Sequence, residues 1–383
     1  MTSLASAEAG SQSANSDRAI GLWLLACCAM IFAMAVIGAV TRLTESGLSI
    51  MEWAPLAGAL PPLGAAEWER VFALYRQIPE YREWGGGMTL AEFKTIFWWE
   101  YVHRLWGRLI GVVFLVPFLW FLLRRRLRPG LAPHLVVMFG LGGLQGALGW
   151  YMVASGFAER TDVSQYRLVA HLGAAVAIYA YILWIALGLL VPRPSPSPDA
   201  RTAGLRALLI ALAGLVLIAM ASGGFVAGLN AGLVYNTFPL MDGQLVPAGY
   251  GRMEPWTVNL FENRIAVQFN HRALAVASAA VAVLSWLWSR RLRLSPRARG
   301  ACTLVLAMAL AQFGLGVATL LLVVPVGLAA LHQAGALALL TLTLWAIHVV
   351  RGAPGTAIVY PLCGRARAKP RRRGEEREEA SKI

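Results

Sequence analysis

Long runs of uncharged residues recur along the chain, and short polar segments separate them. Six runs contain no Asp, Glu, Lys or Arg and are each 19 to 25 residues long; they are residues 20–40, 135–153, 168–191, 207–226, 301–324 and 326–350. A helix needs about 20 apolar residues to cross the hydrocarbon core of a bilayer. Each run therefore predicts one transmembrane helix.

Two further runs complete a set of eight spans. Residues 101–123 carry Arg104 and Arg108 only near their start, and Pro117 is tolerated because neighbouring groups in a membrane bundle can satisfy the freed carbonyl. Residues 269–288 form the other span. The fold class expected is an all-α polytopic membrane protein. The longest polar segment, 41–100, is expected to include interfacial helices near 67–77 and 90–99.

Composition agrees with this fold and explains the basic charge. Of the 383 residues, 58% are hydrophobic and 14% are charged, whereas a soluble domain has about 25% charged residues. The arginines lie in alternate connections: Arg124, Arg125, Arg126 and Arg128; Arg193, Arg201 and Arg206; Arg290, Arg291, Arg293, Arg297 and Arg299. Cytoplasmic loops hold such an excess. Both termini are therefore predicted inside, and the net charge of +14 reflects topology rather than a nucleic-acid partner.

The first 17 residues contain Glu8 and Asp17, no Arg and no apolar core. An organelle transit peptide is rich in Arg and poor in acids, and a secretory signal has an apolar core. Neither fits, so a bacterial inner membrane is the location expected. The C-terminal residues 351–383 are dense in charge and are predicted to be a solvated cytoplasmic tail.

The two halves of the chain resemble each other. The matched positions are Gly38 with Gly223, Gly47-Leu48 with Gly232-Leu233, His103-Arg104 with His271-Arg272, Gln145 with Gln312, Leu148-Gly149 with Leu315-Gly316, and His171 with His332. A repeat of four helices keeps one orientation, so its axis lies along the membrane normal. We expect two tandem pseudo-symmetric four-helix bundles at 19–192 and 207–350, joined by a cytoplasmic linker at 193–206 and preceded by a cytoplasmic tail at 1–18.

Four of the six histidines obey this repeat, with one on each even-numbered span: His103, His171, His271 and His332. All lie near the outer ends of their helices and therefore share one depth. Two imidazoles facing each other across a bundle are what a six-coordinate haem iron requires. Small residues follow each histidine at helical spacing, which would leave room for a flat macrocycle. Tight helix packing through small residues is the alternative interpretation.

The remaining polar residues within the apolar regions are expected to have structural roles. His134 and His348 have no partner in the repeat and are interpreted as interfacial histidines, with His134 in a basic cytoplasmic loop. Gln145 and Gln312 are expected to tie neighbouring helices together by hydrogen bonds.

The chain resembles the haem A synthase family over about residues 21–350. The motifs that carry the resemblance are GAVTRLTESGLS at 38–49, EYVHRLWGR at 100–108, GLVYNTFPLM at 232–241 and QFNHR at 268–272. The resemblance implies oxidation of the C8 methyl of haem O to a formyl group by successive hydroxylations, giving haem A for terminal oxidases. His103 and His171 match the family's substrate-side pair, His271 and His332 match its haem b pair, and Glu100 matches a carboxylate needed for activity.

The segment 41–100 contains no cysteine, so the chain resembles the cysteine-free branch found in alphaproteobacteria and mitochondria. The resemblance further implies haem sites towards the periplasmic side, haem O as substrate, an unidentified electron donor, an encounter with haem O synthase and a homo-oligomer. The farnesyl tail of haem O favours entry from the membrane lipid. Two other functions stay open at this point, namely a di-haem b-type electron-transfer cytochrome and a transporter built on parallel repeats.

One aligned position distinguishes the halves. Glu100 lies three residues before His103, whereas Gln268 lies three residues before His271. Residues at this spacing share a helix face, and a carboxylate can accept protons or stabilise positive charge where an amide cannot. We therefore expect the N-terminal half to be catalytic. Pairing of Glu100 with Arg104 four residues later is the structural alternative.

Overall fold

The computed structural model describes residues 2–53, 57–84, 86–157, 162–191 and 200–350. The predicted tail at 351–383 and the first half of the predicted linker at 193–206 lie outside the described residues. No β-strand occurs in the described ranges, where an isolated bridge joins Met241 and Gln244.

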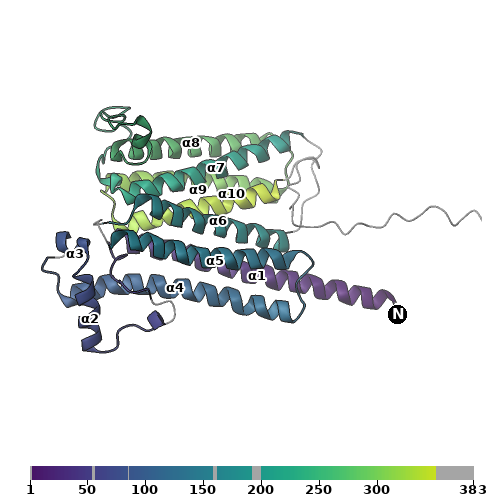
Figure 1. The fold of residues 1–383 in the computed structure, drawn as a ribbon. Coiled ribbons are helices and arrows are strands. Elements are labelled where there is room, and N and C mark those ends of the chain that lie inside the picture. Colours follow the sequence, from purple (N-terminus) through teal and green to yellow (C-terminus); the bar gives the residue numbers. More distant parts are fainter. Residues whose placement is uncertain (1, 54–56, 85, 158–161, 192–199, 351–383) are drawn as a thin grey trace, which may run out of the picture.

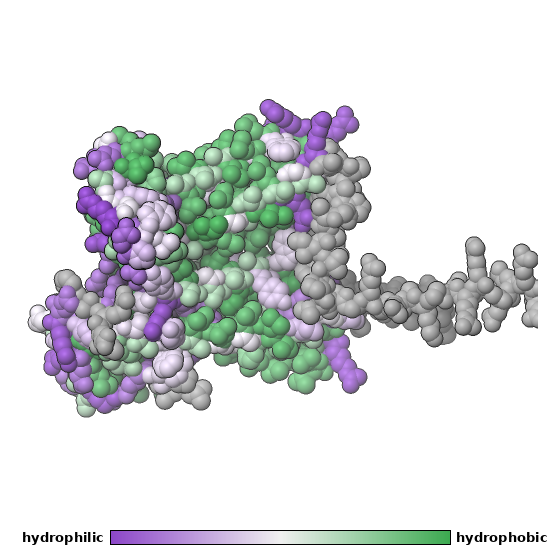
Figure 2. All heavy atoms as spheres, turned by 45° about the horizontal axis from the view of Figure 1, so that its top comes forward, coloured by the Kyte–Doolittle hydropathy of each residue, from purple (hydrophilic) through white to green (hydrophobic). Residues whose placement is uncertain are grey.

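Within the described residues, eight long helices are apolar and long enough to cross a membrane, as the sequence predicted. Their bounds are α1 Thr2–Leu43, α4 Leu90–Leu123, α5 Leu131–Val153, α6 Gln165–Leu190, α7 Ala200–Gly228, α8 Arg264–Arg290, α9 Pro296–Leu321 and α10 Val326–Val349. They form one bundle with their axes roughly side by side (Figure 1). A broad apolar belt separates polar ends (Figure 2). Large apolar side chains such as Val116 and Leu310 are exposed, as lipid contact requires.

Short helices cover one end of the bundle, opposite the N-terminus (Figure 1). They are α2 Ala65–Tyr75 and α3 Pro79–Trp84, together with 3-10 turns at Ala57–Ala59, Ala154–Gly156, Ala231–Leu233 and Trp256–Leu260. The rings of Phe72 on α2 and Phe93 on α4 stack 4.8 Å apart, and Trp68 meets Phe97 edge-on at 4.8 Å. Aromatic burial of this kind fastens α2 to the start of α4.

Several helix limits differ from the predicted ones, and two of the differences have a clear local cause. The helix expected near 67–77 is α2, but residues 90–99 are the first turns of α4 rather than a separate interfacial helix. Thr89 caps α4 in a capping box with Glu92, and nothing interrupts the helix between there and residue 101. The span expected at 301–324 ends at Leu321, because Val323 and Val324 adopt positive φ before Pro325, which is the N-cap of α10.

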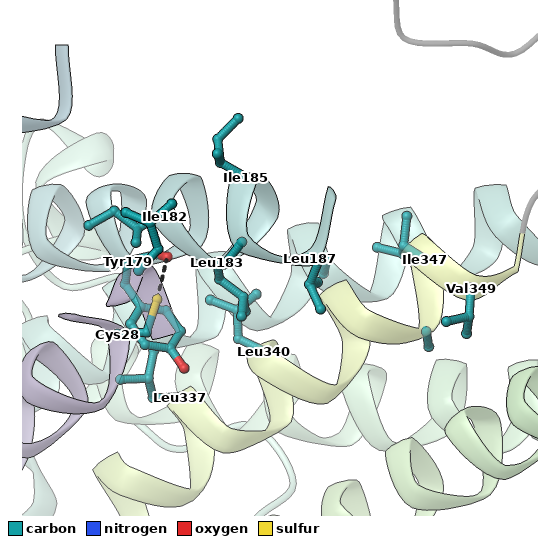
Figure 3. Packing of buried hydrophobic residues seen from close by; sticks show 14 of the residues in the cluster. Cys28, Tyr179, Ile182, Leu183, Ile185, Leu187, Leu337, Leu340, Ile347 and Val349 are labelled. Carbon is teal, nitrogen blue, oxygen red and sulfur yellow. Dashed lines mark hydrogen bonds between the residues drawn. The ribbon is translucent and has the colours of Figure 1, made fainter. Parts of the chain in front are cut away.

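The helices of the two halves pack against each other across the middle of the bundle. Helix α1 contacts α4, α6 and α10, while α7 contacts α8, α10 and α6. The main apolar core lies there, where Cys28 of α1 packs beside Leu183 of α6 and Leu337 of α10 (Figure 3). Gln333 of α10 donates to the Ala35 carbonyl at 2.7 Å. This shared core holds the helices that carry the histidines.

Candidate functional site

The four repeated histidines lie on four different helices. His103 is on α4, His171 on α6, His271 on α8 and His332 on α10. His171, His271 and His332 fall within roughly the first two turns of their helices. His103 comes later in α4 because that helix begins about three turns earlier than predicted.

The imidazoles of His271 and His332 face each other between α8 and α10. Their ring centroids are 6.3 Å apart and their planes cross at 87°. Imidazole nitrogens bind first-row metals such as zinc at ~2.0–2.1 Å, so two rings on opposite sides of a metal have centroids roughly 6 to 6.5 Å apart. The spacing of this pair therefore fits a haem iron held between two axial histidines.

A glycine from a neighbouring helix backs each of the four rings. A β-carbon added to Gly38 of α1 would come within 3.3 Å of His103 Nε2, and one on Gly223 of α7 within 3.2 Å of His271 Cε1. The same measure is 3.0 Å from Gly149 of α5 to His171 and 2.8 Å from Gly316 of α9 to His332. The sequence marked these glycines as repeat positions, and the fold shows their common role: they leave room for the histidines.

A glutamine on the adjoining helix holds the second histidine of each half. Gln145 Nε2 lies 3.1 Å from His171 Nδ1 and donates to the His171 carbonyl at 2.9 Å. Gln312 Nε2 lies 3.1 Å from His332 Nδ1 and donates to the His332 carbonyl at 2.8 Å. These bonds tie α5 to α6 and α9 to α10, which confirms the predicted tie. They also hold the His171 and His332 rings in one orientation, as second contacts to metal-binding histidines do.

Space beside the histidines is less uniform than the small residues suggested. Gly111 on α4 has open space where a β-carbon would project, and Gly107 faces only the tip of Met34 at 3.4 Å. Gly335, three residues after His332, instead makes room for the Gln312 side-chain oxygen. The small residues therefore serve the hydrogen-bonded glutamine as well as any bound macrocycle.

Glu100 is buried beside residues 44–53, which follow α1. Its Oε2 accepts hydrogen bonds from the Ser49 hydroxyl and the Ile50 backbone N–H, both at 2.7 Å. Its Oε1 pairs with Arg104 at 2.5 Å. The structural alternative from the sequence, a pair between Glu100 and Arg104, is thus present.

A second buried carboxyl lies outside the spans. Glu80 of α3 is 8% exposed, and its Oε2 has no hydrogen-bond partner among the described residues. Burial raises the pKa of Glu80 to about 8, and the nearby carboxylates of Glu45 and Asp162 act in the same direction. No sequence pattern pointed to this group, because its burial depends on how α3 folds back against the bundle.

The prediction that His134 lies in a loop was wrong, whereas the interfacial location of His134 and His348 stays a prediction. His134 lies in the first turn of α5 rather than in a loop, and its Nδ1 lies 2.5 Å from the Tyr181 hydroxyl of α6. His348 is 2% exposed, and its ring meets that of Trp184 at 5.5 Å. Both are buried packing residues at the opposite end of the bundle from Glu100. Helix α5 begins at Leu131, before the predicted span at 135–153, and therefore includes His134.

Comparisons with known proteins agree on one family. The COX15-CtaA model, described as a cytochrome oxidase assembly protein, matches residues 21–344. A protein of Rhodospirillum centenum named "Heme A synthase" is 54% identical over 353 residues, covering 92% of this chain and 94% of that one. A protein of the same name from Nitrosospira multiformis is 53% identical over 335 residues, covering 88% and 94%. One from Parvibaculum lavamentivorans is 44% identical over 330 residues, covering 86% and 94%.

Proposed function

Because the chain belongs to the COX15-CtaA family of cytochrome oxidase assembly proteins, we propose that its two halves divide one enzyme between a substrate haem and a resident haem. The chain is a multi-pass membrane oxidoreductase that converts haem O to haem A. The observation that carries the division is the aligned difference between Glu100 in the N-terminal half and Gln268 in the C-terminal half.

His271 and His332 would hold the resident haem b. Their facing rings, 6.3 Å apart, suit an iron with two axial ligands. When bound, the haem supplies one-electron chemistry at its iron. The protein supplies the two ligands, the glutamine that orients one of them and the glycines behind both. A resident haem in this half leaves the other half for haem O.

His103 and His171 would ligate the substrate haem. They occupy the matching positions of the N-terminal half, with matching contacts from Gly38, Gly149 and Gln145. Oxidation of the C8 methyl builds positive character on that carbon and releases protons. Glu100, three residues from His103 on the same helix, offers a fixed negative charge for this step.

Pairing with Arg104 does not account for Glu100 by itself. Arg272 is the counterpart of Arg104 and binds its own outer segment with no carboxylate four residues before it. The fold therefore forms the same arginine contacts without an acid. The carboxylate in the N-terminal half is available for chemistry as well as for pairing.

The location we propose is a bacterial inner membrane, with both termini inside and the histidines towards the periplasmic side. The alternating arginines support it. The two halves as pseudo-symmetric bundles are part of the same proposal, supported by the like contacts of α1 and α7 and by the matched glycine and glutamine contacts. Haem O synthase, an electron donor and a second copy of the chain are the proposed partners, with haem O entering from the lipid.

Chromatography of the haems extracted from purified protein tests this function. We expect haem b in one fixed amount per chain, together with haem O, haem A or a hydroxylated intermediate. Two equivalent haem b groups and unchanged haem A in cells lacking the protein would instead identify a di-haem electron-transfer cytochrome. The relatives do not favour that function.

A further inference from the structure

Each half has an arginine that binds the segment preceding its own helix, residues 44–89 before α4 and residues 229–263 before α8. We call this contact the clamp. Arg104 donates to the carbonyls of Ile50 at 2.6 Å and Glu52 at 3.0 Å. Arg272 donates to the carbonyls of Tyr235 and Thr237, both at 2.8 Å. With Gly38 aligned to Gly223, these are the same two positions in the repeat. The clamp is therefore common to both halves and shows that the alignment holds in this segment.

The halves differ beside the clamp at two positions that touch in the N-terminal half. Ser49 and Glu100 are joined there by a hydrogen bond of 2.7 Å. The aligned residues are Val234, whose side chain has no donor, and Gln268, whose Nε2 donates to the Tyr235 carbonyl at 2.9 Å. The hydroxyl and the carboxylate thus occur together in one half and are both absent from the other.

Burial makes this pair energetically significant. Ser49 is 1% exposed and Glu100 is 2% exposed, so no water competes for their bond. A buried carboxylate is costly unless donors satisfy it. Glu100 has three donors, of which the Ile50 N–H belongs to the backbone and Arg104 belongs to the clamp. The Ser49 hydroxyl takes no part in the contacts of Arg104 with the Ile50 and Glu52 carbonyls, so its hydrogen bond to Glu100 is separate from the clamp.

We propose that Ser49 is a positioning residue for Glu100, and that it fixes the carboxylate in the orientation that methyl oxidation uses. The inference rests on the proposed catalytic role of Glu100. Hydrogen-bond donors that are set before the reaction are worth more in a buried site than in water, because they need no reorganisation. Loss of the hydroxyl should leave the clamp, the helix start and the histidines in place, since Val234 occupies the same position in the other half.

The test uses the full-length protein with four variants: Ser49→Val, Ser49→Thr, Glu100→Gln and the control Ser46→Ala. Carboxyl bands in infrared difference spectra that vanish in Glu100→Gln identify that group. We expect those bands to shift in Ser49→Val and to return towards their native position in Ser49→Thr, which keeps a hydroxyl. Haem A output should fall about 10- to 100-fold in Ser49→Val, the range for losing a hydrogen bond to a charged group.

The control matches Ser49 in burial and differs in its contact. Ser46 is 0% exposed in the same segment, and its hydroxyl bonds Thr44 rather than Glu100. Native bands and native haem A output in Ser49→Val, with activity lost in Glu100→Gln, would overturn the role of Ser49 alone. Native output in Glu100→Gln would overturn the proposed function on which it rests.

Discussion

Gly316 and His332 are so close that a β-carbon on the glycine would lie 2.8 Å from the imidazole Cε1. Real β-carbons do not approach other atoms to that distance, so any larger residue must displace the ring. The ring is already held by Gln312, which lies four residues before Gly316 on the same helix. Position 316 therefore controls where a proposed axial ligand can lie.

Gly316→Ala should move His332 and weaken haem b binding. Forcing one methyl into a packed site costs about 1–3 kcal/mol, which corresponds to roughly a 5- to 150-fold loss of affinity. Haem content and the Soret spectrum of the purified variant measure this. Gly314→Ala is the control, because a β-carbon there meets nothing within 4 Å. Equal haem content in the two variants would contradict the prediction.

Removal of either proposed haem b ligand should change the spin state. An alanine cannot ligate iron, so His271→Ala and His332→Ala should convert a low-spin haem to a high-spin one and lower its occupancy. Optical and EPR spectra report both changes. His348→Ala is a useful comparison, since that histidine is buried at the other end of α10. Native spectra in both ligand variants would remove these residues as ligands.

Exchange of the aligned residues tests which half is catalytic. Glu100→Gln should keep haem b and accumulate haem O or a hydroxylated intermediate, because an amide supplies no negative charge. Gln268→Glu should have a much smaller effect on haem A output. Chromatography of total haems from cells that express each variant makes the comparison. Normal haem A output from Glu100→Gln would remove Glu100 from the mechanism.

Glu80 should make the protein less stable as pH rises. Its pKa is about 8 in the folded chain and 4.5 in an ordinary setting, so the unfolded chain loses its proton first. Stability therefore declines from pH about 4.5 to pH about 8, by at most a few kcal/mol. Glu80→Gln should raise Tm at pH 8 and leave it nearly unchanged at pH 5 in detergent. Glu83→Gln, exposed on the same helix, is the control; an equal Tm change at both pH values in Glu80→Gln would contradict the argument.

Reporter fusions test the orientation. A phosphatase that is active only in the periplasm should be silent when fused after Pro196, between α6 and α7, and active after Gly243, between α7 and α8. The arginines near the first connection keep it inside. The reverse pattern of activity would invert the topology.

Much of the candidate site could be proposed from the sequence because repetition is visible there. The repeat selected the four histidines out of six and paired Gln145 with Gln312. Contacts of the glycines could not be predicted, since Gly38 and His103 are brought together by the packing of α1 on α4 and not by spacing within one helix. The link between Ser49 and Glu100 was missed for the same reason.

Hydropathy and charge along the chain determined the number of spans, their order and the all-helical class. Those properties are set by local transfer free energies, residue by residue. Only the tertiary structure decided which residues meet across helices: the glycine behind each histidine, the burial of His134 and Glu80, and the hydroxyl on Glu100. Contacts of that kind depend on how helices rotate and approach one another, and the hydrophobic pattern of a single helix does not specify either.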